Sequence, residues 1–169
     1  MPADFFLEIV AKKGGKIKGE TLSQACPDQI EVSKFTIGLS SPTDYTSGEA
    51  TGRIQLDHAE FEFPSSLAST PLFQTLCTND VLKTVTLTCR KAGATGKQAT
   101  FLQWCFHDAR LISYKMAGES EIPTDTIKIA YADIEINYKQ QKQDGSMATT
   151  GLSARYDANA NAMTSPSLK

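Results

Sequence analysis

The feature that most constrains the fold of this chain is a change of phase within its apolar alternation. Apolar residues recur at every second position, which is the pattern of β-strands with one buried face. Within residues 29–39, Ile30 and Val32 are followed by Phe35 and Ile37, so the apolar side chains move to the other parity. A one-residue slip turns every later side chain to the opposite face. Such a strand must therefore bulge, or bend from one sheet into another.

The same change of phase recurs later in the chain. It separates Ile54 and Leu56 from Phe61 and Phe63, and Ile127 and Ile129 from Ile134 and Ile136. The alternation predicts strands at about 4–11, 29–39, 50–63, 80–91, 99–116 and 125–138. Repeated bends are typical of sheets that cross and close on each other. We therefore predict a mainly β fold, a small closed β-barrel of two orthogonally packed antiparallel sheets.

One segment departs from the β pattern. Leu72, Phe73 and Leu76 fall on one face of a helix, and Pro71 suits its first turn. We predict one short α-helix at about 70–78, lying against the side of the barrel.

Two stretches have few branched apolar residues. Residues 40–52 are small and polar, and a connection of this length inside a compact domain usually has a function. The end of the chain, from about 147–169, reads as a polar tail, within which Arg155-Tyr156-Asp157 is a candidate for a further short pairing segment. A chain of 169 residues fits one hydrophobic core, so we predict a single domain over residues 1–169 that includes this tail.

The charges are nearly balanced, with 17 basic and 19 acidic side chains and a formal net charge of −2. Such a chain has no long-range field that would gather nucleic acid or an anionic membrane. The first apolar run is followed by lysines, the reverse of the order in a secretory signal. No apolar stretch approaches the roughly 20 residues that cross a bilayer. We expect synthesis in the cytoplasm, with neither nucleic acid nor membrane insertion.

The sequence contains no recognisable catalytic or metal-binding motif. His58 and His107 lie outside any metalloprotease or serine hydrolase pattern. Residues 93–97 are too short for a phosphate-binding loop, and Gln98 stands where Ser or Thr would hold magnesium, so we predict a hairpin turn. We expect no catalytic, cofactor-binding or metal-binding residues. A hydrolase built on either histidine remains the enzymatic alternative.

The chain has four cysteines and no CxxC pair. In a reducing compartment such thiols are usually buried as small apolar side chains. We expect this of Cys26, Cys77, Cys89 and Cys105.

Several blocks of the chain resemble, in order, those of one known family. Residues 19–32 resemble the opening of that family, and Phe35-Thr36-Ile37-Gly38 stands where it has Trp-Ser-Trp-Gly. Residues 87–93 are similar to its Arg-Lys-Ala-Gly turn, and residues 123–146 to its last strand and exit. On these blocks the chain resembles the Hcp (haemolysin-coregulated protein) family of type VI secretion. It departs from the family pattern at Phe35 and Ile37, and at Cys26, where many members have His.

The resemblance implies a function in assembly and not in catalysis. Family members form hexameric rings that stack into a tube inside a contractile sheath. The resemblance implies partners of four kinds: other copies of the chain, the sheath, the spike, and effectors that are sheltered in the ring lumen. It also implies export without a signal peptide to the extracellular space or a target cell, with no cofactor and no small-molecule substrate.

Thr36 is the one small polar position in an apolar half-strand, and we expect it to face the lumen. A solvated outer face would explain the same alternation, and both interpretations stay open. The resemblance suggests that the loop at 40–52 reaches a neighbouring subunit, with Thr43, Asp44, Tyr45 and Glu49 as contact candidates. The alternative from another class is a monomeric ligand-binding β-barrel carrier, which would need an apolar cavity open at one end.

Overall fold

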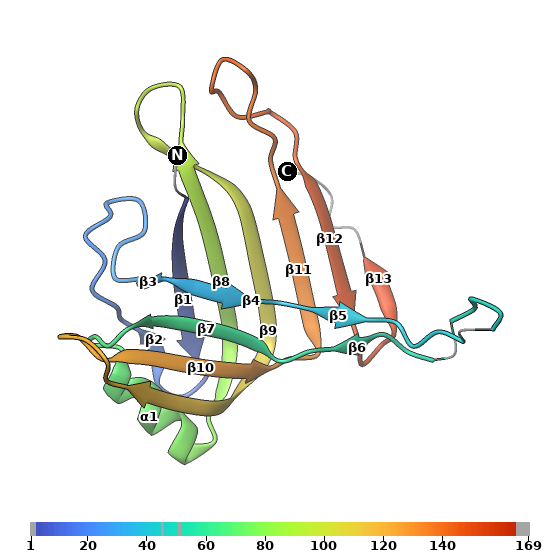
Figure 1. Ribbon diagram of the computed structural model, residues 1–169, viewed down its shortest axis with the longest axis horizontal. Helices are drawn as coiled ribbons and strands as arrows, with labels where there is room; N and C mark the ends of the chain where they lie inside the picture. The colour runs from blue at the N-terminus through green and yellow to red at the C-terminus, as the bar shows by residue number, and fades with distance from the viewer. Residues whose placement is uncertain (1–2, 45, 51, 165–169) are drawn as a thin grey trace.

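The computed structural model describes residues 3–44, 46–50 and 52–164 (Figure 1). Within them one helix, α1 (Ser69–Thr78), interrupts a series of antiparallel strands. The strands are β1 (Asp4–Ala11), β2 (Gly15–Ile17), β3 (Ile30–Val32), β4 (Lys34–Thr36), β5 (Leu39–Ser40), β6 (Gln55–Leu56), β7 (Ala59–Pro64), β8 (Val81–Ala92), β9 (Gln98–Ala117), β10 (Thr124–Ala130), β11 (Asp133–Tyr138), β12 (Leu152–Asp157) and β13 (Ala162–Thr164).

The strand pairings close into a barrel. From β1 they run through β8, β9, β10 and β7 to β4. β3 then pairs with β1, and only Ser33 separates β3 from β4, so the ladder returns to its start. Ser33 itself donates its backbone N–H to the carbonyl of Glu62 at 2.9 Å. The closure therefore depends on two strands of three residues each.

Two sheets cross in this barrel, and β9 is common to both. Figure 1 shows β4, β7 and β10 running across the direction of β1, β8 and β11. β9 bends at Asp108, whose φ of 50° lies in the left-handed region, and the register between β10 and β9 shifts between Lys128 and Ile129. Bulges of this kind let one strand serve two sheets. The predicted mainly β barrel of crossing sheets is confirmed, and β11, β12 and β13 extend one sheet beyond it.

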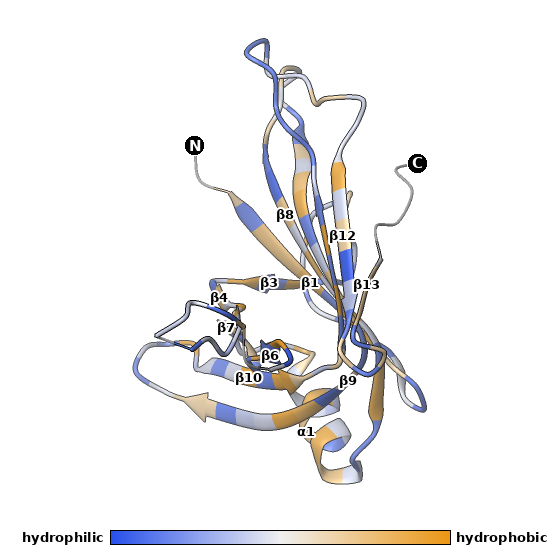
Figure 2. Cartoon of the chain, turned by 90° about the vertical axis from the view of Figure 1, so that its right-hand side faces the viewer, coloured by the Kyte–Doolittle hydropathy of each residue, from blue (hydrophilic) through white to orange (hydrophobic). Residues whose placement is uncertain are grey.

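Phenylalanine and branched aliphatic side chains fill the space between the sheets. Phe61, Phe63 and Phe106 are fully buried, and the rings of Phe61 and Phe106 meet edge to face with centroids 6.2 Å apart. Figure 2 shows hydropathy changing from residue to residue along the strands, as expected when one side of each strand faces this core. A ligand carrier needs an open apolar cavity here. The packed interior gives that alternative no support.

The helix lies against the barrel as predicted. Leu72 on its inner face is fully buried. Its first turn is anchored by Asp125 of β10, a fully buried carboxylate that accepts hydrogen bonds from Ser65 Oγ at 2.7 Å and Ser69 Oγ at 2.5 Å. These contacts connect the helix, and the loop before it, to the sheet that contains β10.

Three expectations need correction. The region at 29–39 is divided among β3, β4 and β5, because the phase change at Ser33 moves the chain from β1 to β7. The end of the chain is not an irregular tail as far as it is described, since β12 and β13 lie within it and pair with the extended sheet. Cys77 is exposed, whereas Cys26 and Cys89 are buried and Cys105 is partly buried.

Candidate functional site

Four neighbouring strands present a polar outer surface. β4, β7, β10 and the second half of β9 form one wall of the barrel. On each strand alternate residues enter the core, Phe61 and Ile127 among them, and the residues between them point outward. We call this outward set the polar face: Lys34, Thr36, Glu60, Glu62, Ser113, Lys115, Thr126 and Lys128.

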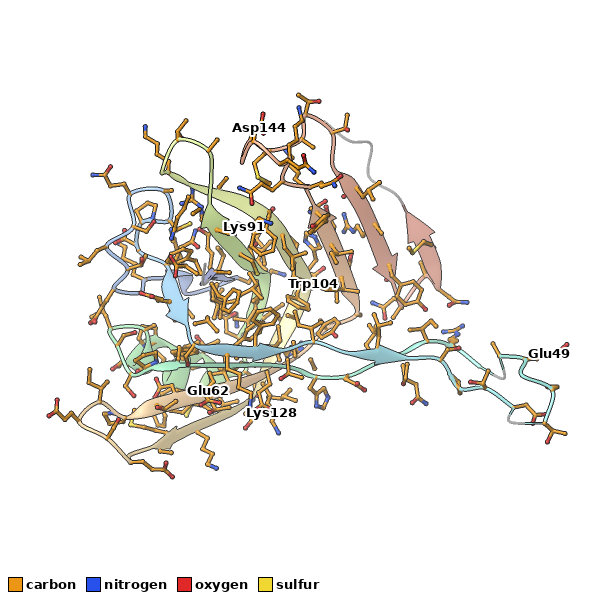
Figure 3. The ribbon with its side chains drawn as sticks, turned by 45° about the horizontal axis from the view of Figure 1, so that its top comes forward. Glu49, Glu62, Lys91, Trp104, Lys128 and Asp144 are labelled. Carbon is orange, nitrogen blue, oxygen red and sulfur yellow. The ribbon has the colours of Figure 1, made fainter. Side chains whose placement is uncertain are left out.

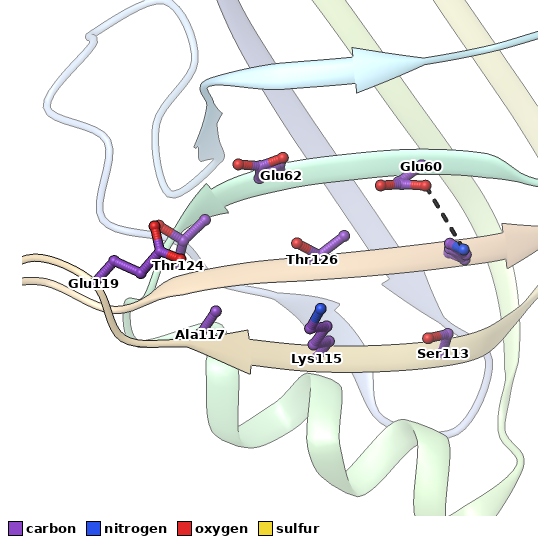
Figure 4. Close-up of a pocket in the computed structure, with 9 residues that line it drawn as sticks. Glu60, Glu62, Ser113, Lys115, Ala117, Glu119, Thr124 and Thr126 are labelled. Atoms are coloured by element: carbon purple, nitrogen blue, oxygen red, sulfur yellow. Dashed lines mark ion pairs between the residues drawn. The ribbon is translucent and has the colours of Figure 1, made fainter.

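The strand register aligns these residues in rows. One row is Thr36, Glu60, Lys128 and Ser113, and the next is Lys34, Glu62, Thr126 and Lys115. Figure 4 shows side chains of β7, β10 and β9 along a hollow of about 420 Å³, with Ala117, Glu119 and Thr124 at one end. Aromatic rings and long aliphatic side chains do not occur among the residues that line it. The hollow is therefore unlike a site for an apolar small molecule, which is lined mainly by hydrophobic groups.

Opposite charges on this face largely cancel. Glu60 Oε2 lies 3.8 Å from Lys128 Nζ, and both side chains are about half exposed, so the pair contributes at most about 1 kcal/mol. The three lysines of the face equal in number the carboxylates of Glu60, Glu62 and the nearby Glu119. Among the described residues, Glu62 and Lys115 have no ion pair within 4 Å. The result is a hydrated surface without net charge.

Thr36 belongs to this face. It is exposed and lies opposite Glu60 in the register of β4 and β7. The sequence analysis did not single out its neighbours on β7, β9 and β10. The sequence did contain a signal for these neighbours. Polar and apolar residues alternate in Ala-Glu-Phe-Glu-Phe at 59–63 and in Thr-Asp-Thr-Ile-Lys at 124–128. The register that aligns the rows could not be obtained from any one segment.

The loop predicted to reach a neighbour is an extended hairpin, which we call the arm (residues 39–56). β5 pairs with β6, a further bridge joins Thr43 to Ala50, and the hairpin projects away from the barrel (Figures 1 and 3). Of the predicted contact residues, Thr43, Asp44 and Glu49 are exposed, and Tyr45 lies outside the described residues. Figure 3 places Glu49 at the far end.

Asp44 stabilises the turn of the arm. Its carboxylate accepts a hydrogen bond from the backbone N–H of Thr46 at 2.8 Å, which lowers the pKa of Asp44. Its own N–H donates to the carbonyl of Glu49 at 2.8 Å. Two of the predicted contact residues thus also define the shape of the arm.

The sheet that carries the polar face has two edges along which no described strand pairs, and α1 contacts β9, the strand at one of them. β4 pairs with β7 on one side, and none of the described strands pairs with its other side. The pairing of β9 with β8 ends at Arg110, whereas its pairing with β10 continues to Ala117. Open edges carry unpaired backbone groups that can bind another chain.

The hairpin turn predicted at residues 93–97 is present and is joined to a second loop. Gly93 N–H donates to the carbonyl of Lys97 at 2.8 Å. The side-chain amide of Gln141 donates to the carbonyls of Ala92 and Gly145, at 2.8 and 2.9 Å. Gly145 has a φ of 82°, and a Cβ there would lie 2.9 Å from Ala94 Cα. Glycine is therefore required where these two loops meet.

The two histidines lie in separate places. His107 is on β9, with Nε2 3.6 Å from Glu135 Oε2 across the sheet. His58 is exposed between β6 and β7. The described residues bring together no group of three side chains of the kinds that bind metals.

Comparisons with known proteins show which proteins share this fold. The family model described as "Type VI secretion system effector, Hcp" matches residues 6–138. A solved structure described as a type six secretion system protein has a TM-score of 0.82 at 20% identity, covering 95% of this chain and 99% of its own. Hcp1 from Salmonella typhimurium has a TM-score of 0.73 at 22% identity, covering 97% and 100%. Hcp1 from E. coli EAEC 042 has a TM-score of 0.75 at 18% identity, covering 91% and 97%.

No curated protein matches the chain at a significant level. Across the described residues, α1 is the one helix, and it is too short and too polar to traverse a bilayer. The solved structures are less than 25% identical to this chain and establish the fold, while the family model covers well over half of the sequence. The chain therefore belongs to the Hcp family of type VI secretion system proteins.

Proposed function

We propose that this protein is the tube subunit of a type VI secretion system, forming hexameric rings whose channel is lined by the polar face. The observation that carries the proposal is a sheet with a polar outer surface of balanced charge and two edges along which no described strand pairs. It occurs in a chain of the Hcp family. The subunit acts by assembly and not by catalysis.

The open edges support ring closure. A ring needs a head-to-tail interface made by two different surfaces of each subunit. The free edge of β4 and the free edge of β9 after Arg110 are two such surfaces, at opposite sides of one sheet. Pairing them around a ring would join the polar faces of all subunits into one continuous wall. It would also protect backbone groups that otherwise promote aggregation.

The chemistry of the polar face supports a channel for protein cargo. Its exposed side chains are lysine, glutamate, threonine and serine, which bind water and present no apolar patch to a passing protein. In this proposal, small effectors are sheltered in the lumen before the tube, its spike and its cargo leave the cell within a contracting sheath. Export occurs without a cleaved signal peptide.

Oligomeric mass tests the assembly directly. We expect size exclusion with light scattering to give a mass near six times 18.4 kDa at micromolar concentrations. Dilution should reveal dissociation without loss of the β-rich circular dichroism spectrum, since the barrel has its own core. A monomer at every concentration up to the millimolar range would contradict the tube proposal and favour the carrier.

Thr36→Gln tests the lumen assignment. Thr36 is exposed on β4, so the longer side chain should leave stability within about 0.5 kcal/mol of the parent. We expect the mass of the ring to be unchanged and the yield of small proteins that co-purify with it to fall several-fold. Quantitative mass spectrometry of the purified ring measures this yield. Thr95→Gln, in the exposed turn between β8 and β9, is the matched control. Equal yields for the wild type, Thr36→Gln and Thr95→Gln would place Thr36 outside the lumen.

A further inference from the structure

The charges of the polar face balance over the whole face but not within each row. One row is neutral, because its only charged side chains are Glu60 and Lys128, which form the ion pair at 3.8 Å. The other row has two ammonium groups and a single carboxylate, so each subunit presents one excess positive charge there. We call this row the lysine row: Lys34, Glu62, Thr126 and Lys115.

The two lysines of this row are available to a partner. Lys34 and Lys115 are both exposed, and neither has an ion pair within 4 Å among the described residues. Figure 4 shows Lys115 on β9 at the hollow of the polar face, with Thr126 and Glu62 on the neighbouring strands. An ammonium group on a flexible side chain can turn its three donors toward an anion. A carboxylate bound at these lysines therefore comes from another molecule.

Closure of the proposed ring brings lysines of two subunits to one seam. Lys115 lies on β9 and Lys34 on β4, the strands at the two open edges. Successive strands from β4 through β7 and β10 to β9 are antiparallel, so β9 of one subunit can pair with β4 of the next as an antiparallel neighbour. Each seam then has a lysine on both sides and no carboxylate of the row between them. Like charges placed opposite each other in a sheet are destabilising, and a bound carboxylate would remove this repulsion.

Protein carboxylates fit this row better than the phosphates of nucleic acid. Glu60, Glu62 and Glu119 line the same hollow and would repel a backbone that carries a charge at every nucleotide. The residues that line the hollow include no aromatic ring on which a base could stack. A protein surface carries both signs of charge and can meet the lysines while avoiding the glutamates. Each exposed ion pair is weak, but the ring repeats the row in every subunit, so several pairs can form at once.

We propose that the channel selects cargo by its acidic side chains, which bind Lys34 and Lys115 at the seams between subunits. This inference deepens the proposed tube function and rests on it, because the seams exist only in the ring. It names the chemical class of cargo: small proteins with aspartate or glutamate clustered on their surface. Recognition of this kind weakens as salt screens the charges.

Peptide binding to the assembled ring tests the selection. The probe is a fluorescent peptide of alternating glutamate and serine, and the comparison peptide has lysine in place of glutamate. We expect fluorescence anisotropy to show that the ring binds the glutamate peptide about tenfold or more tightly than the lysine peptide, with a difference that shrinks as salt is added. Equal binding of the two peptides would overturn the proposal.

A double variant locates the binding. Lys34→Gln with Lys115→Gln keeps polar side chains but removes the charges, so the affinity for the glutamate peptide should fall about tenfold. The matched control is Lys83→Gln with Lys97→Gln, which removes the same charge at exposed positions outside the polar face and should bind as the wild type does. Unchanged affinity in the first variant, or the same loss in both variants, would contradict a site at the lysine row.

Ring stability gives a second readout that a merely structural role would move in the opposite direction. Removing the like charges from the seams should leave the ring of the Lys34→Gln and Lys115→Gln variant at least as resistant to dilution as the wild type. The glutamate peptide should protect the wild-type ring against dilution and leave the variant unaffected, because only a bound ligand shifts the equilibrium. Light scattering over a dilution series measures both effects. A variant ring that dissociates more readily without peptide would mean that the lysines hold the subunits together, and would overturn the proposal.

The remaining outcomes separate this inference from the tube function. Wild-type rings that bind neither peptide would overturn the inference and leave the tube standing, whereas a wild-type monomer at all concentrations would overturn both. An oligothymidine probe is the test for nucleic acid. If it binds more tightly than the glutamate peptide and loses its affinity in the same double variant, the lysine row belongs to nucleic acid and the proposal is wrong.

Discussion

Replacing Phe106 by Ala is expected to lower the free energy of unfolding by about 3–5 kcal/mol, a large part of the stability of a domain of this size. Phe106 is fully buried where the two sheets meet. Its ring centroid lies 6.2 Å from that of Phe61 and 4.7 Å from that of Tyr131. Truncation removes these contacts and leaves a cavity that the crossing sheets cannot close. Urea denaturation followed by circular dichroism measures the loss.

Tyr131 provides a second readout for the same variant. Burial raises the pKa of Tyr131 to about 12. Removing the neighbouring ring admits water to the phenol, so in Phe106→Ala this pKa should fall toward the ordinary value of about 10. Spectrophotometric titration of the tyrosines detects the change. Phe73→Ala, at a position 59% exposed, is the control and should cost about 1 kcal/mol or less. Similar losses for the two variants would show that Phe106 does not hold the sheets together.

Asp125→Ala is expected to cost about 3 kcal/mol or more, because it leaves two hydroxyl groups without their acceptor. Hydrogen bonds to a charged group contribute about 1.5–3 kcal/mol each, and Asp125 accepts one from Ser65 and one from Ser69. Because these serines anchor α1 and the loop before it, the damage should concentrate there. We expect hydrogen exchange in residues 64–78 to accelerate more than exchange in β1 or β8.

Ser65→Ala serves as the graded comparison for Asp125→Ala. It removes one donor and leaves Ser69 in place, so its cost should be about half as large. A uniform loss of protection over the whole barrel in Asp125→Ala would mean that the carboxylate stabilises the core in general. Equal costs for the two variants would assign the whole effect to Ser65.

The sequence predicted the bends of the barrel better than its pairings. The phase change after Val32 marks the junction at Ser33, where the chain leaves β1 and joins β7. The change between Ile129 and Ile134 marks the end of β10. These bends can be predicted from a single segment, because a slip of one residue appears as a change of phase in that segment's apolar alternation.

Strands held by their partners were predicted only in part. β12 has little apolar alternation and lies in the segment assigned to a polar tail, of which only residues 155–157 were a candidate for pairing. It forms because it pairs along β11, where Arg155 binds Asp133 through Nε and Nη2 at 2.9 and 2.6 Å. β2 has only three residues and pairs with β1 through a tight turn. Neither strand has an apolar alternation of its own that would predict all of its residues.

The candidate site was also predicted only in part. Thr36 was identified from its own strand, whereas the polar face joins segments up to about ninety residues apart in the chain. Their alignment depends on register shifts such as the one between Lys128 and Ile129, which no single segment reveals. A slip of one residue at that point would turn the side chains of Lys115 and Ser113 toward the core.

The length of β9 has a mechanical consequence. This strand of 20 residues is paired on one side with β8 from Gln98 to Arg110. On its other side it is paired with β11 from Leu102 to His107 and with β10 from Arg110 to Ala117. Its hydrogen bonds lie across the strand direction, so a push along the strand loads many of them in shear at the same time. Because β9 belongs to both sheets, a force applied along either half of the strand is resisted by many hydrogen bonds of that sheet together. A force that peels β9 away from a neighbouring strand would instead break the hydrogen bonds between them one at a time.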